Sequence, residues 1–110
     1  MTLQKKLEKL YKSFLLLDCD VFHFTRGDTR APYVVWSEAG EESSFHADDR
    51  KQEQQLTGFV DFYTLTEFDP IVDDIQEILN SEEIGWALST VLYEEETNLI
   101  HYQWRWWTCG

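Results

Sequence analysis

The sequence feature that most constrains the fold is a strict alternation near the C-terminal end. Between residues 99 and 107 every second residue is large and apolar, and the apolar set is Ile100, Tyr102, Trp104 and Trp106. Neighbouring side chains on a strand point to opposite faces of a sheet, so this run predicts a strand with one apolar face. Another β-rich run, residues 86–93, precedes it across the polar residues 94–98. The sequence therefore predicts a C-terminal β-hairpin whose apolar face needs cover.

Two other segments have helical spacing. Apolar residues recur at intervals of three and four between residues 3 and 17, with lysines between them and Thr2 as a candidate N-cap. Asp69 and Pro70 favour the start of a second helix, because Asp accepts free amides and Pro is tolerated in the first turn. This second helix is expected to run to about Asn80, with one side lined by Ile71, Ile75, Ile78 and Leu79.

Three more β-rich runs, residues 21–24, 33–36 and 56–66, predict strands. Residues 37–55 lose apolar character almost completely, which predicts a long loop or a mobile arm. The expected fold class is α+β with the order α-β-β-β-α-β-β, in a single domain spanning residues 1–110. We expect a mostly antiparallel sheet with both helices packed on one face.

The charge balance excludes two classes of partner. Lys and Arg total 9 against 21 for Asp and Glu, and the formal charge of -12 repels nucleic acid and anionic membranes. The first twelve residues are locally +3, from four lysines and one glutamate, which leaves -15 on the rest. A basic helix can therefore attract an acidic body, within one molecule or between copies. The alternative is a helix with a solvated lysine face.

Localisation follows from two further observations. No stretch approaches the roughly 18 apolar residues needed to cross a bilayer, and the N-terminal pattern is not that of a signal peptide. We therefore expect a cytoplasmic protein in which Cys19 and Cys109 remain reduced thiols.

Motifs for chemistry are missing from the sequence. His23, His46 and His101 do not have the spacing of metal ligands, and no nucleophile motif occurs. Adjacent carboxylates such as Asp73 and Asp74 are expected in so acidic a chain and indicate a solvated surface. We therefore expect no metal, no cofactor and no enzymatic activity.

Five tryptophans lie in or beside predicted strands, and two helices offer limited cover for them. Tryptophan and tyrosine are enriched at protein interfaces, so we expect subunit contact rather than stacking of sugars or bases. The predicted interface with another subunit or partner consists of Trp36, Phe45, Trp86, Tyr102, Trp104, Trp106, Trp107, Lys5 and Lys9.

The order of elements resembles that of the tail-terminator, or tail-completion, proteins of long-tailed bacteriophages. Residues 31–36 (APYVVW) resemble the short strand that this family enters through proline. Residues 58–64 (GFVDFYT) and 69–75 (DPIVDDI) resemble its long strand and following helix, and the hairpin at residues 93–107 also resembles the family's.

This resemblance implies a non-enzymatic structural protein of a phage or prophage. Such a subunit forms a ring homo-oligomer, a hexamer on assembly, that caps the tail-tube protein and joins it to the head connector. It would be found in the tail or neck of the virion after assembly in the bacterial cytoplasm, and it inherits no catalytic residues. The alternatives are another neck or minor capsid component, an acidic protein-binding module that inhibits by mimicking DNA, and a small enzyme.

Overall fold

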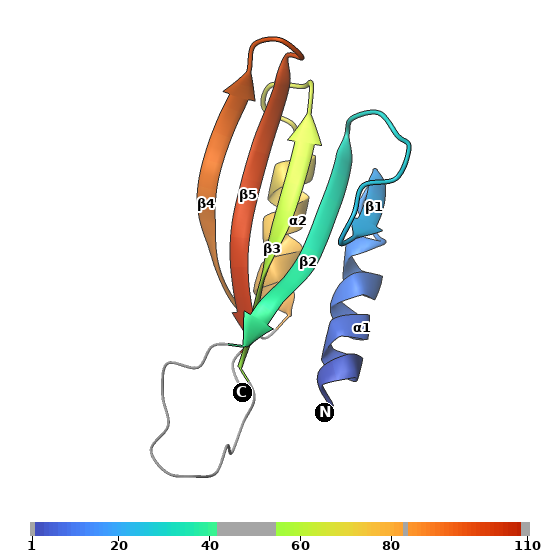
Figure 1. The fold of residues 1–110 in the computed structure, drawn as a ribbon, viewed down its shortest axis with the longest axis vertical. Helices are drawn as coiled ribbons and strands as arrows, with labels where there is room; N and C mark the ends of the chain where they lie inside the picture. Colours follow the sequence, from blue (N-terminus) through green and yellow to red (C-terminus); the bar gives the residue numbers. More distant parts are fainter. Residues whose placement is uncertain (1, 42–54, 83, 109–110) are drawn as a thin grey trace.

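The computed structural model describes residues 2–41, 55–82 and 84–108. The elements in chain order are α1 (Leu3–Phe14), β1 (Asp20–His23), β2 (Tyr33–Glu41), β3 (Leu56–Thr64), α2 (Ile71–Ser81), β4 (Ile84–Glu94) and β5 (Leu99–Thr108). The five strands form one sheet in the order β1-β2-β3-β5-β4 (Figure 1). The chain has the α+β class and the two helices expected from its sequence.

The sheet is mixed, which corrects part of the expectation. β1 pairs with β2 in parallel, whereas the β2–β3, β3–β5 and β5–β4 pairs are antiparallel. The connection of residues 24–32 is short for a parallel crossover, but β1 has only four residues. A strand rises about 3.3 Å per residue, so the connection has to run back only the short length of β1 before β2 begins.

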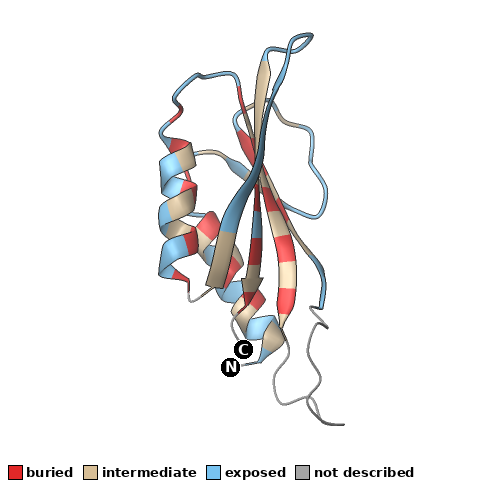
Figure 2. Cartoon of the chain, turned by 90° about the vertical axis from the view of Figure 1, so that its left-hand side faces the viewer, coloured by how far each residue is buried: buried red, intermediate tan, exposed pale blue. Residues whose placement is uncertain are grey.

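The core lies between one face of the sheet and the two helices, as expected (Figure 2). α1 contributes Leu7, Leu10 and Phe14, and α2 contributes Ile71, Ile75 and Leu79. The sheet residues that face them are Val34, Trp36, Leu56, Val60, Phe62, Trp104 and Trp106. We call this covered side of the sheet the helix face and the other side the open face.

The loop expected at residues 37–55 is wrong at its beginning. β2 continues to Glu41, and its residues from Ser37 onward pair with the first residues of β3. Main-chain hydrogen bonds of a ladder do not depend on apolar side chains, so a polar segment extends the strand where a partner strand is available. The expected arm at residues 42–54 lies outside the described residues.

The helix ends follow local hydrogen bonding. Thr2 caps α1 by accepting a bond from the amide of Lys5 at 3.3 Å. α1 ends at Phe14 instead of continuing to Leu17, because the last amides bond three residues back and tighten the turn. At α2 the Asp69 carboxylate accepts from the amide of Ile71 at 2.9 Å, as the sequence indicates.

Candidate functional site

Three of the predicted interface residues are in the core, so the prediction is wrong for them. Trp36 is 1% exposed, and Trp104 and Trp106 are 0% exposed. They lie on the helix face of the three central strands, where both helices cover them. Two helices therefore bury more tryptophan than the sequence suggested, because all three side chains point to the same, covered face of the sheet.

Trp86, Tyr102 and Trp107 are half-buried. The rings of Trp86 and Tyr102 pack against the edge of the core, and the Trp86 indole donates to Asn80 Oδ1 at 3.0 Å. Trp107 lies on the open face, where the guanidinium of Arg105 sits 5.2 Å from its ring centre. These three side chains line the border between the core and the surface.

The two predicted lysines differ. Lys9 Nζ lies 3.7 Å from Glu82 Oε2, so part of the predicted attraction between helix and body occurs within the chain. Lys5 is exposed, and its side chain has no partner within the described ranges. Phe45 lies outside the described residues.

The exposed large hydrophobic residues within the described strands all lie on β4, which the sequence did not single out. The exposed fractions are 44% for Leu88, 50% for Val91, 55% for Leu92 and 59% for Tyr93. We call these four side chains, with the outer main chain of β4, the β4 edge. In Figure 2 β4 is the strand nearest the viewer, and most of it is exposed.

The β4 edge has little of the usual protection of edge strands. Natural edge strands are short or carry charges or proline, which prevent pairing with other chains. β4 has eleven residues, and residues 84–93 contain no charged residue and no proline. One β-bulge, at Ser89 between Leu88 and Thr90, interrupts its pairing with β5. The uncharged run was visible in the sequence, but only the strand order reveals that it forms an edge.

The open face carries a row of stacked rings across the sheet. Tyr63 stacks between Tyr33, at 4.8 Å, and His101, at 4.2 Å between ring centres. Beside the row, Asp61 Oδ1 lies 2.7 Å from His101 Nε2 and accepts from Gln103 at 3.0 Å. Burial, with the nearby Asp61 carboxylate, raises the pKa of Tyr63 to about 12. The rings contact one another, so the row stabilises the sheet.

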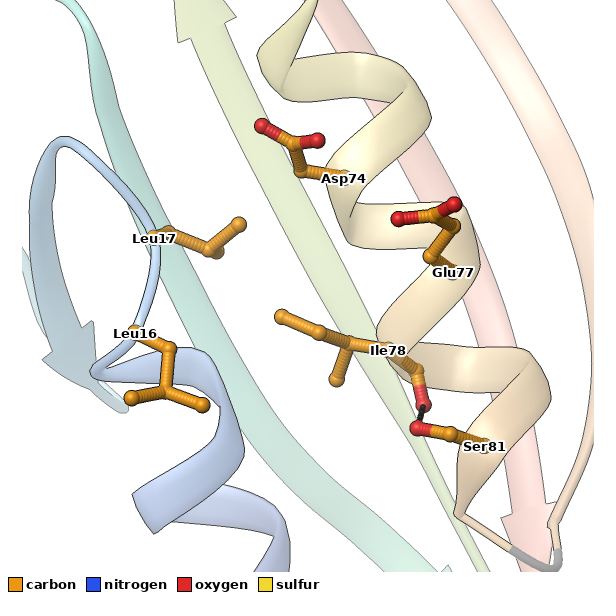
Figure 3. A pocket seen from close by; sticks show the side chains of 6 residues that line it. All are labelled: Leu16, Leu17, Asp74, Glu77, Ile78 and Ser81. Atoms are coloured by element: carbon orange, nitrogen blue, oxygen red, sulfur yellow. Dashed lines mark hydrogen bonds between the residues drawn. The ribbon is translucent and has the colours of Figure 1, made fainter.

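The cleft between α2 and the turn after α1 has a volume of about 540 Å³ (Figure 3). Leu16, Leu17 and Ile78 form its apolar part, and Asp74 and Glu77 provide carboxylates. The only hydroxyl there, from Ser81, donates to the carbonyl of Ile78 at 2.9 Å. The cleft thus contains acids and a hydroxyl but no histidine or lysine to act with them.

Two further observations concern chemistry. Burial, with the carboxylates of Asp20, Asp69 and Asp18, raises the pKa of the Cys19 thiol to about 11, so the reactive thiolate is scarce at neutral pH. Within residues 2–41, 55–82 and 84–108 no three histidine, cysteine or acidic side chains gather as metal ligands.

The comparisons with known proteins do not assign this chain to a family. Neither a scan against protein-family models nor a search of curated proteins finds a match to this chain. Neither of the helices in the described ranges has the length and apolar character to span a membrane.

Proposed function

We propose that this chain is a non-enzymatic structural subunit that works by binding other protein chains. Its specific role in this proposal is that of a ring-forming tail terminator, or tail-completion subunit, of a long-tailed phage. It caps the tail tube, joins it to the head connector and resides in the tail or neck of the virion. Another neck or minor capsid position is compatible with the same surfaces.

The observation that carries this proposal is the β4 edge. An eleven-residue edge strand that is uncharged over residues 84–93 exposes main-chain donors and acceptors together with four apolar side chains. Such an edge is a template for strand addition by another chain. A subunit whose task is assembly benefits from this surface, whereas a free monomer is exposed to aggregation through it.

The test measures the mass of the particles that the chain forms in solution. Native mass spectrometry and light scattering should detect oligomers that increase with concentration, or a ring that forms when tail-tube protein is added. Leu88→Lys/Val91→Lys should remain monomeric under both conditions, because charge on the β4 edge opposes strand pairing. Monomers alone at every concentration, with and without tail-tube protein, would rule out the proposal.

One observation favours the acidic binding module as a second candidate. Asp73, Asp74 and Glu77 lie on the exposed side of α2, and none of them has a cationic partner among the described residues. Such a module should bind a basic protein with an affinity that falls steeply with salt. Asp74→Asn/Glu77→Gln should weaken that binding and leave the oligomeric state of the chain unchanged.

A further inference from the structure

The two edge strands of the sheet, β1 and β4, have residues in the same rows across the sheet. The pairings place Asp20 of β1 in the same row as Tyr33, Tyr63, His101 and finally Leu92 of β4. By the same pairings Val21 shares a row with Val91, and His23 with Leu88. The four residues of β1 thus lie level with the part of β4 that carries three of its four exposed apolar side chains.

The directions of β1 and β4, and the faces to which their side chains point, are also compatible with pairing between two copies. β1 runs with β2, and three antiparallel pairings then leave β4 running in the opposite direction to β1. Placing a second copy beside the first, in the same orientation, brings β4 and the new β1 together as antiparallel strands. Residues of one row point to the same face, so Val21 of one copy meets Val91 of the other on the helix face.

We propose that β4 of one copy pairs with β1 of the next copy, so that the sheet continues from subunit to subunit. This inference rests on the proposed function and names its partner, a second copy of this chain. On the helix face, Leu88, Val91 and Tyr93 are exposed because no helix of their own copy covers them. The next copy brings its β1, with the helix layer that leads into it, to that side.

Charged residues just beyond the row of Asp20 and Leu92 support this arrangement. Arg30 lies in the connection just before β2, and Glu95 and Glu96 lie in the turn after β4, at the same end of the sheet and on opposite sides of it (Figure 1). All three are exposed and have no side-chain partner within the described ranges. A neighbouring copy brings Arg30 toward the two glutamates, so the contact is complementary in charge.

The contact is head to tail, since it joins two different edges. Such a contact repeats, and it closes into a ring when the rotation between copies divides a full turn. Pairing of β4 with a second β4 would instead end at two chains. It would leave the β1 edge open and would give Glu95 and Glu96 no cation from Arg30.

Cysteine cross-linking tests the register directly. In a Cys19→Ser/Cys109→Ser background, one chain carries Asp20→Cys and another carries Leu92→Cys, both at exposed positions. Opposite residues of antiparallel strands are close enough for a disulfide. Under mild oxidation the mixture should give a covalent dimer that neither chain gives alone, and a chain with both cysteines should give a ladder of oligomers. The matched control, Leu65→Cys mixed with Asp20→Cys, should stay uncross-linked.

Charge reversal tests the orientation. Arg30→Glu alone, or Glu95→Lys/Glu96→Lys alone, should weaken self-association roughly fivefold in sedimentation experiments at low salt. The three changes combined should restore it, because the attraction is rebuilt with opposite signs. Glu8→Lys, an exposed reversal on α1, should leave self-association unchanged.

The outcomes separate this inference from the proposed function. Cross-linking of Leu92→Cys with itself, or a mixture no more reactive than the Leu65→Cys control, overturns the β4–β1 contact. The same holds if the combined reversal fails to restore an association that the single reversals weaken. If the unmodified chain nevertheless forms a ring on tail-tube protein, the proposed function stands and only this contact is wrong.

Discussion

β5 and β4 are the two arms of one hairpin, and both have β-forming sequences, yet their surroundings differ. β5 lies between β3 and β4, and its Trp104 and Trp106 are completely buried under the helices. β4 has a partner strand on one side only and is exposed along most of its length. The difference shows that neighbours in the sheet, not the apolar content of a strand, decide which residues form the core and which are available to other chains.

The largest expected effect compares two residues directly opposite each other on this hairpin, Trp104 and Leu88. Trp104→Ala should lower the free energy of unfolding by about 3–5 kcal/mol, because it leaves a cavity in the core. Leu88→Ala should cost less than about 1 kcal/mol, since its side chain is already 44% exposed. Urea unfolding of dilute protein measures both, and equal losses would mean that β4 is buried as deeply as β5.

A pair of glycines gives the next effect. A Cβ at Gly58 in β3 would collide with the buried Trp106 ring and with the carbonyl oxygen of Ser37. A Cβ at Gly85 in β4 would have its three closest contacts with the side chain of Trp107, which is half-buried and can move. Gly58→Ala should therefore destabilise by about 1–3 kcal/mol and Gly85→Ala by less. Thermal melts compare the two variants. A larger loss for Gly85→Ala would contradict the view that the centre of the sheet is rigid and its β4 edge adaptable.

The smallest effect concerns two indole hydrogen bonds to α2. Trp104 donates to Gln76 Oε1 at 3.2 Å in a partly buried site, and Trp86 donates to Asn80 Oδ1 at 3.0 Å on the surface. Gln76→Ala should cost about 1 kcal/mol, because it leaves a buried donor without an acceptor. Asn80→Ala should cost less, because water replaces the lost acceptor. A larger loss for Asn80→Ala in chemical unfolding would show that Trp86 is the more deeply buried of the two.

Much of the fold could be predicted from the sequence because it depends on local chemistry. The cap at Thr2, the start of α2 at Asp69 and Pro70, and the hairpin arise from residues near one another in the chain. The parallel pairing of β1 and the extension of β2 to Glu41 could not be predicted, because each depends on a partner strand distant in the chain.

The candidate site was less predictable for the same reason. Alternation along β5 indicates which residues share a face but not whether a helix covers that face. The sequence therefore predicts an interface role for Trp104 and Trp106, although both lie in the core. The uncharged β4 run looked like any other strand, because a strand's place at the edge is set by the other strands.

By itself the sequence determined the α+β class, the two amphipathic helices, the apolar face of β5 and the acidic charge of the whole chain. These follow from side-chain periodicity and composition, which belong to the chain before it folds. The tertiary structure alone decided that β4 is an edge, that three tryptophans fill the core, and that β1 and β4 lie level across the sheet. Burial and register are relations between distant segments, and they exist only once the strands are packed together.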